Sequence, residues 1–366
     1  MTSHTVVHGA LGEPPHGGQV APAAGEPSEA TPRSDGFAMP AEWAEHQLTL
    51  VAWPCHPAAY RRAGAGGMER AEVEYASVAN AVSDFEPVLM LVRPDVRARA
   101  RRQLAATIDL LEVDLDDAWI RDNGPIFVTD SASRVAMVHF AFNGWGGKFP
   151  SDRDGRVAAQ LASHFGVRRY VAPMVLEGGS FFVDGEGTLV TTEQCLLNPN
   201  RNPLLSREQI ELTLGRYLGV DSVIWLGERH FMDPDTDGHV DCVAQFSRPG
   251  RVVVHAPSNR NHPDHDRGRE NVERLRSVRD ARGRSLEVVT LDTGTTRGAP
   301  NLNCYLCNGA VIAPVVGLAE DTVALELLQA EYPTREVVPV PATAILTAGG
   351  GPHCITQQVP AGTFVT

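Results

Sequence analysis

Short apolar runs typical of β-strands alternate with amphipathic helical segments along nearly the whole chain. The strand-like runs include LTLVAW (48–53), PVLMLV (87–92), IFVT (126–129), SVIWL (222–226) and AVIAPVV (310–316). Between such runs lie helical patterns such as 68–85, 155–166, 206–219, 266–283 and 320–332. Alternation sustained over this length predicts an α/β protein.

The first 36 residues differ in composition from the rest. They are rich in Gly, Pro, Ala, Ser and Glu and contain almost no aromatic residues. Such a segment cannot bury enough apolar surface to offset its ordering entropy, so residues 1–36 are predicted to form a disordered tail. No Pro/Gly/Ser linker divides the remainder, which predicts one domain over residues 37–366.

Composition and charge limit the kinds of partner. Hydrophobic residues make up 43% of the chain and charged residues 21%, as in soluble globular proteins. A net charge of −13 argues against a nucleic-acid partner and favours a small cationic ligand. We find no secretory signal and no membrane-spanning apolar run, and six cysteines are too few for a disulfide scaffold. These features predict a reduced, cytoplasmic protein that binds no membrane.

Four stretches place ionisable residues beside glycines at probable strand ends. They are DDAWIRDNGP (116–125), LEGGSFFVDGEGTLVTTEQCLLNPNRNP (176–203), DPDTDGHVDCVAQF (233–246) and AGGGPHCITQQ (348–358). None of the glycine runs has the spacing of a dinucleotide-binding or P-loop motif. Glycine also allows close backbone approach, so these stretches are the candidates for a functional site.

The residue types allow both a catalytic and a structural interpretation. Cys354 is either a nucleophile activated by its surroundings or a small buried apolar residue. If HVDCVAQF is a strand, the side chains of His239 and Asp241 point to the same face. They then form either a proton-transfer pair or part of the solvent-exposed face of a half-buried strand. Carboxylates such as Asp122 and Glu177, taken singly, more often form surface ion pairs than take part in catalysis.

A zinc site is the competing use of Cys and His. CYLC (304–307) has the spacing of half a zinc site, but the sequence offers no second pair at a suitable distance. We therefore expect no metal.

Together, these stretches resemble the agmatine deiminase family, a branch of the guanidino-group-modifying enzymes that is related to peptidylarginine deiminases. The resemblance runs from MPAEWAEHQLTLVAWP near residue 39 to the C-terminus. It is carried, in the family's order, by DDAWIRDNGPIFV, FNGWGGKFP, LEGGSFFVDGEGTLVTTEQCLLNPNRNP, TDGHVD, NGAVIAPVVG and the GGGPHCITQQ segment.

This resemblance implies a fold and a set of residue roles. The implied fold is the pentein α/β propeller, five ββαβ units around a central channel that holds the active site. Matched motif by motif, the implied roles are a nucleophile (Cys354), a general acid/base (His239), guanidinium-binding carboxylates (Asp122 and Asp241), a residue that orients His239 (Glu177), a ligand of the substrate's distal amine (Asp235) and an aromatic wall (Trp119).

The implied activity is that of a hydrolase acting on C–N bonds of linear amidines. Agmatine would be converted to N-carbamoylputrescine and ammonia through a covalent amidino-cysteine, a step toward putrescine in polyamine biosynthesis. The chemistry suits the residues, since two carboxylates can hold a planar guanidinium under a thiolate. It needs no metal or organic cofactor. Relatives of this kind also imply a homodimer or larger homo-oligomer in the cytoplasm.

Two segments depart from the family pattern and leave alternatives open. Gly351 and Pro352 replace the Asn and Ile of the usual GGGNIHC, and GAPNLNCYLCNG replaces SYLNFYIANG. The substrate is therefore either agmatine or another guanidino compound, such as arginine or an arginine-derived intermediate. An amidinotransferase using the same intermediate is a further alternative. A catalytically inactive binding protein is disfavoured because Cys354, His239 and the carboxylates are all retained.

Overall fold

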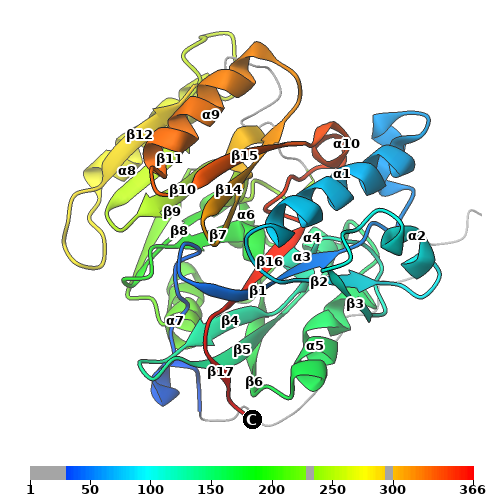
Figure 1. Ribbon diagram of the computed structural model, residues 1–366. Coiled ribbons are helices and arrows are strands. Elements are labelled where there is room, and N and C mark those ends of the chain that lie inside the picture. Colours follow the sequence, from blue (N-terminus) through cyan, green and yellow to red (C-terminus); the bar gives the residue numbers. More distant parts are fainter. Residues whose placement is uncertain (1–29, 228–234, 293–299) are drawn as a thin grey trace, which may run out of the picture.

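The computed structural model of the protein describes residues 30–227, 235–292 and 300–366 (Figure 1). Most of the predicted tail, residues 1–29, lies outside these ranges. Its last residues differ from the prediction, because the 3-10 helix η1 (Arg33–Asp35) packs on the protein. Arg33 pairs with Asp221 at 2.5 Å and Asp35 with Arg168 at 2.7 Å. These partners are far away in the sequence, so composition alone did not reveal the ordered end of the tail.

Within the described ranges, five small sheets form the fold, and all five share one strand order. Each has two antiparallel strands followed by a third strand parallel to the middle one. In chain order the five sets are β4 (Ile126–Thr129), β5 (Arg134–Ala141), β6 (Arg169–Val175); β7 (Phe181–Val183), β8 (Thr188–Thr192), β9 (Ser222–Leu226); β10 (Ala244–Arg248), β11 (Arg251–His255), β12 (Glu287–Leu291); β13 (Tyr305–Cys307), β14 (Ala310–Val315), β15 (Glu336–Pro341); and β16 (Thr356–Pro360), β1 (His46–Ala52), β2 (Val88–Val92). β3 (Asp109–Glu112) and β17 (Thr363–Phe364) extend two of the sheets.

A helix connects the second and third strands of each unit, giving the ββαβ order. The connecting helices are α1 (Gly67–Ser83), α5 (Val157–Phe165), α7 (Arg207–Leu218), α8 (His265–Ser277) and α9 (Ala319–Glu331). Figure 1 shows α5, α7, α8 and α9 at the periphery of the molecule. Shorter helices lie in the loops: α2 (Arg97–Arg101), α3 (Ile120–Asn123), α4 (Gly144–Gly147), α6 (Glu193–Leu196), α10 (Thr343–Thr347), η2 (Ala59–Ala63), η3 (Asp154–Arg156), η4 (Gly178–Ser180), η5 (Val240–Cys242) and η6 (Pro300–Leu302). The α/β class and the five ββαβ units are thus confirmed.

Local sequence explains where these helices begin and end. Helix α7 starts at a capping box in which Ser206 and Gln209 each bond the other's backbone N–H. It stops at Gly219, whose φ of 75° is the left-handed conformation that glycine tolerates best. The predicted helix over 206–219 therefore has its caps at both ends of the pattern.

The two ends of the chain share one unit. The late strand β16 pairs antiparallel with the early strand β1, with Gln358 opposite Thr49. β16 is polar but buried throughout, and the Gln358 side chain accepts a 2.7 Å hydrogen bond from Arg121 Nη1. This bond satisfies the buried amide of Gln358, whereas the amide atoms of the neighbouring Gln357 have no hydrogen-bond partner among the described residues. The pairing of β16 with β1 therefore joins the segment after Cys354 to the first strand of the chain.

The segment HVDCVAQF is a strand only in its second half. Residues Val240–Cys242 form the 3-10 helix η5, preceded by His239, and the strand β10 begins only at Ala244. The turn leading into it places Asp237 and Gly238 at positive φ, which interrupts the extended conformation. His239 and Asp241 therefore do not share the face of a strand.

Candidate active site

The candidate site residues occupy equivalent places in four of the five units. Each lies in the short segment that leads into the first strand of its unit. Asp122 precedes β4, Glu177 precedes β7, His239 and Asp241 precede β10, and Cys354 precedes β16. The segments α3, η4, η5 and η6 contact one another in that order, and α3 also contacts β16. The fold therefore gathers residues that are far apart in the sequence into one buried cluster.

Cys354 is buried among polar groups from two other units. Its Sγ lies 3.3 Å from Asp241 Oδ2, to which the thiol can donate, and 3.1 Å from Asn303 Nδ2. Asn303 was not predicted as a site residue, although it lies in the departing segment GAPNLNCYLCNG. A Cβ added at Gly351 would lie 2.6 Å from Asn303 Oδ1, so glycine at this position admits the Asn303 amide beside the thiol.

The glycines before and opposite the thiol bring the backbone close to it. A Cβ at Gly350 would lie 3.0 Å from Cys354 Sγ and 2.4 Å from the Trp119 ring. A Cβ at Gly179 would lie within 2.9 Å of His239 Nδ1, Asp122 Oδ1 and Asp241 Oδ2. Only glycine fits such positions, which explains both glycine runs.

Asp122 is held in a fixed orientation. Its Oδ1 accepts a 2.9 Å hydrogen bond from Gly179 N–H, and its Oδ2 accepts one of 2.9 Å from Trp145 Nε1. His239 Nδ1 lies 3.8 Å from the same carboxylate. Trp145, in the FNGWGGKFP motif, was not predicted as a site residue, and its φ of 55° shows an uncommon backbone conformation for a tryptophan. The strained turn thus supplies a donor to a predicted guanidinium-binding carboxylate.

The electrostatics of the site favour the neutral thiol. Burial, followed by the charges of Asp241, Cys242 and Asp122, raises the pKa of Cys354 well above its usual value. Burial likewise raises the pKa of Asp122, with Asp241 adding to that effect. An excess of negative charge in a buried space favours binding of a cation, which would lower both pKa values.

A buried chain of ionisable groups lies behind Asp241. His353 Nδ1 is 3.0 Å from Asp241 Oδ2, and His353 Nε2 is 3.0 Å from Glu42 Oε2. Although burial opposes its charged form, the two carboxylates raise the pKa of His353 above its usual value. The same pairing overcomes burial and lowers the pKa of Glu42 to about 2. The shift favours the imidazolium form of His353, and although burial opposes it, the bond to His353 lowers the pKa of Asp241. Sequence analysis missed this role of His353 and Glu42.

Glu177 lies beside His239 but is paired with a different residue. Its Oε1 accepts a 2.6 Å hydrogen bond from Arg201 Nε, and both side chains are fully buried. Arg201 also binds Asp237 at 2.5 Å and the Thr236 carbonyl oxygen at 2.9 Å. Arg201 therefore ties Glu177 to the turn that carries His239. The motif CLLNPNRNP contained this arginine, but its role was not predicted.

Glu177, Cys195 and His239 are also the described residues that could together hold a metal ion. Their ligand atoms lie within 4.8 Å of one another. The guanidinium of Arg201, however, is already bound to Glu177. A positive charge in contact with one of three ligands disfavours a second cation there.

The predicted wall residue Trp119 is fixed by a buried carboxylate. Its Nε1 donates a 3.0 Å hydrogen bond to Asp117 Oδ2, and Asp117 Oδ1 accepts from the Ala118 N–H. Burial raises the pKa of Asp117 to about 7. Trp119 is buried against Gly350, so the structure places it beside the thiol.

Asp235 lies at the far end of the glycine run. A Cβ at Gly349 would lie 3.3 Å from Asp235 Oδ2. The carboxylate is bound by Arg62, with 2.5 Å between Arg62 Nη1 and Asp235 Oδ2. Asp235 is therefore near the cluster but paired with a cation of the protein.

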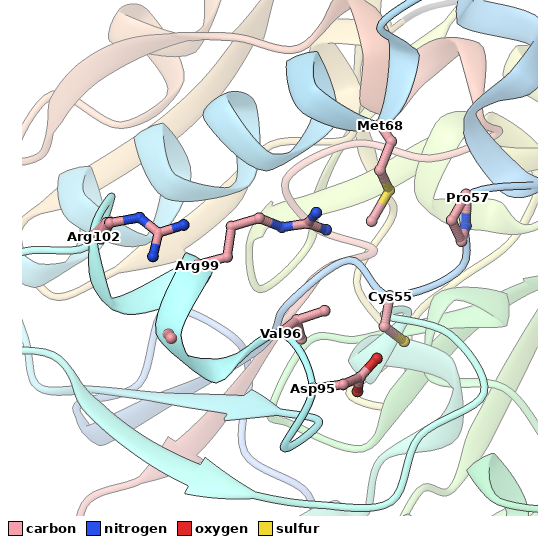
Figure 2. Close-up of a pocket in the computed structure, with 8 residues that line it drawn as sticks. Cys55, Pro57, Met68, Asp95, Val96, Arg99 and Arg102 are labelled. Carbon is pink, nitrogen blue, oxygen red and sulfur yellow. The ribbon is translucent and has the colours of Figure 1, made fainter.

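A separate cavity between the start of α1 and helix α2 has a different character (Figure 2). It has a volume of about 520 Å³, and its lining comprises Cys55, Pro57, Met68, Asp95, Val96, Ala98, Arg99 and Arg102. Burial and nearby carboxylates, Asp117 first, raise the pKa of Cys55 to about 12. A protonated thiol beside two arginines suits neither nucleophilic attack nor binding of a guanidinium.

The fold and the cluster define a class of protein. Five ββαβ units that surround a buried cysteine, histidine and carboxylates are the architecture of a pentein.

Comparison with known proteins identifies the family within this class. The model of the Porphyromonas-type peptidyl-arginine deiminase family matches residues 38–360. The "Putative agmatine deiminase" of Shewanella sp. (strain MR-7) is 40% identical over 90% of this chain and 96% of its own length. This chain belongs to the Porphyromonas-type peptidyl-arginine deiminase family.

Solved structures agree with that assignment. The agmatine deiminase of Enterococcus faecalis has a TM-score of 0.84 and 37% identity, covering 90% of this chain and 98% of its own. A substrate-bound agmatine deiminase of C. jejuni has a TM-score of 0.81 and 25% identity, covering 89% of this chain and 97% of its own. The similarity thus extends over the whole five-unit fold.

Proposed function

We propose that this protein hydrolyses the guanidino group of agmatine to N-carbamoylputrescine and ammonia through a covalent amidino-cysteine. The observation that carries the proposal is the contact between the Cys354 thiol and the Asp241 carboxylate, 3.3 Å apart in a buried site. The family assignment and the likeness to agmatine deiminases support it.

Binding precedes activation in this scheme. Asp122 and Asp241 would hold the planar guanidinium by charge-assisted hydrogen bonds, with its central carbon over Cys354 Sγ. The bound cation offsets the negative charges that raise the pKa of Cys354. The thiol proton passes to His239, and the thiolate that remains is adjacent to the carbon it attacks.

Bond making and breaking then follow in two stages. Sulfur adds to the guanidinium carbon, and the His239 imidazolium gives its proton to one terminal nitrogen, which leaves as ammonia. A water molecule deprotonated by His239 attacks the amidino carbon. Collapse of this second adduct expels the Cys354 thiolate, which recovers the proton from His239, and the hydroxyl proton of the adduct passes to solvent as the C=O bond of the ureido product forms. Glu177, fixed by Arg201, would orient His239 for both transfers.

The alternatives concern the far end of the substrate and the acceptor. Asp235 is the residue proposed to bind the distal amine of agmatine. Because Asp235 is paired with Arg62, other guanidino compounds such as arginine remain alternative substrates. An amidinotransferase would pass the same intermediate to an amine instead of water. Formation of product without any added amine distinguishes hydrolysis from transfer.

The test is ureido-product formation by the purified protein offered agmatine and arginine. We expect agmatine to be preferred and Cys354→Ser to abolish the product. Ammonia and N-carbamoylputrescine in equal amounts support hydrolysis. Arginine preferred over agmatine, or product formed by Cys354→Ser, contradicts the proposal.

We also infer a reduced compartment and a homo-oligomer. Among the described residues, the six cysteines form no disulfide, which is compatible with a reducing compartment. Among the described residues, we find no helix with the length and apolarity required to span a bilayer. The assignment of residues 37–366 to one catalytic domain remains a prediction. Sedimentation of the purified protein measures the oligomeric state, and a monomer at all concentrations contradicts the inference.

A further inference from the structure

The carboxylate proposed to bind the distal end of the substrate already has a cationic partner. Arg62 Nη1 donates to Asp235 Oδ2 at 2.5 Å, and Arg62 Nη2 donates to Asp235 Oδ1 at 3.4 Å. The two bonds form a forked contact of the kind that a guanidinium makes with a carboxylate. Arg62, which lies between β1 and β2, therefore occupies the carboxylate at which a substrate amine would bind.

This contact lies close to the nucleophile. The Gly349 position is 3.3 Å from Asp235 Oδ2, and the next position, Gly350, is 3.0 Å from Cys354 Sγ, each measured from an added Cβ. Two consecutive residues thus connect the Asp235 carboxylate with the thiol. A short guanidino compound seated on Cys354 would direct its other end toward Asp235.

The backbone of Arg62 is held by packing, whereas its side chain extends into solvent. It lies in η2, where the buried Tyr60 donates a 2.8 Å hydrogen bond to Tyr75 and the element packs beside α10. The Arg62 side chain itself is 63% exposed. An ion pair this exposed is weak because water competes with it, so a ligand can displace the arginine while η2 stays in place.

The neighbouring carboxylate, Asp237, is not exchangeable in this way. It is bound by the buried Arg201 at 2.5 Å, by Lys148 at 2.6 Å and by Asn200 at 3.0 Å. These bonds hold the turn together. Asp235 is therefore the carboxylate of this turn that a substrate cation can reach by replacing an exposed side chain.

We infer that Arg62 is a specificity-determining residue that competes with the distal cation of the substrate for Asp235. The inference rests on the proposed function. A substrate with a distal ammonium must displace Arg62, whereas a substrate with an uncharged end leaves the pair intact. Arg62 thereby lowers the selectivity of the site for agmatine over guanidino compounds that lack the amine.

The test compares agmatine with 1-guanidinobutane, which has a methyl group in place of the amine. Arg62→Ala is expected to raise kcat/KM for agmatine about two- to fivefold, which corresponds to the free energy of an exposed ion pair. Most of this change should be a decrease in KM. The substitution should leave 1-guanidinobutane unchanged. In an Asp235→Asn background, Arg62→Ala should have no effect on either compound. Added salt should shrink the difference, since it screens an exposed pair.

The neighbouring Arg61 provides the matched control. It is an exposed arginine of the same 3-10 helix, and Arg61→Ala should leave both substrates unaffected. An unchanged agmatine-to-guanidinobutane ratio in Arg62→Ala overturns the inference while leaving the proposed function intact. A ratio that falls shows that Arg62 assists agmatine binding, which also overturns it. Absence of product from both compounds contradicts the proposed function and the inference together.

Discussion

At the scale of single residues, the site relies on a cysteine that is poorly reactive on its own. Cys354 is buried beside Asp241, and the pKa of its thiol is raised well above the usual value by burial and by nearby negative charge. A free enzyme built in this way protects its nucleophile from adventitious electrophiles. The substrate cation then supplies the charge that activates the thiol, which ties reactivity to binding.

This arrangement predicts the pH dependence of thiol alkylation. When no substrate is added, inactivation by iodoacetamide should be slow at pH 7 and rise continuously through pH 9, because the thiolate is the reactive form. The rate is measured as loss of activity, with alkylation of the Cys354 peptide followed by mass spectrometry. Asn303→Ala, which removes the amide donor 3.1 Å from the sulfur, should slow alkylation further at a given pH. A plateau of full reactivity below pH 8 contradicts this account.

The sequence motifs contain residues that lie in one cluster of the structure, but they did not reveal the groups that support that cluster. Cys354, His239, Asp241, Asp122 and Glu177 are brought together, whereas the roles that they play remain proposals. His353 and Glu42 were missed because their contact joins residues 311 positions apart. The spacing of residues within a local motif cannot indicate a pair that is so far apart in the sequence.

At the scale of elements, the segments before the first strands act as supports for the site. The chain from Asp241 through His353 to Glu42 connects η5, the β16 approach and the segment before β1. Glu42 also accepts a 2.9 Å hydrogen bond from the Leu306 N–H. One buried carboxylate therefore braces three of the five units.

Removal of that brace should reduce stability in a pH-dependent way. Glu42 has a folded-state pKa of about 2 against an ordinary value of 4.5, so its contribution is present above pH 4.5 and is lost as pH falls toward 2. Glu42→Gln should cost about 3 kcal/mol at pH 7, as for breaking a buried ion pair. The difference from wild type, measured by urea unfolding, should shrink between pH 4.5 and 3.

The exposed Glu45 serves as the control for that substitution. Glu45→Gln changes the same chemical group three positions away at the surface and should be nearly neutral. A Glu42→Gln variant as stable as wild type at pH 7 shows that the buried pair does not brace the units.

Element prediction worked best for strands and helices with strong patterns. The predicted helices over 206–219 and 320–332 correspond to α7 and α9. The condition that all of HVDCVAQF is a strand is not met, because η5 follows the positive-φ turn at Asp237 and Gly238, and Asp237 is held there by a tertiary bond from Arg201. Tertiary contacts override local propensity in such segments.

At the scale of the whole molecule, the closed ring of five units explains why the site lies at the unit starts. Antiparallel pairing of β16 with β1 completes one unit from the two ends of the described chain. The α/β class follows from the alternation of strands and helices, whereas the fivefold arrangement came from the family resemblance. Periodicity alone could not supply it, because the units share a strand order but no legible sequence repeat.

The central claim is that Cys354 attacks the guanidinium carbon and carries the amidino group. The most direct measurement is mass spectrometry of the protein quenched in acid during turnover of agmatine. We predict an adduct on the Cys354 peptide with the mass of agmatine less ammonia, which disappears as substrate is exhausted and never forms in Cys354→Ser. Ureido product formed at full rate with no adduct on Cys354, or with an adduct on another residue, would contradict the account.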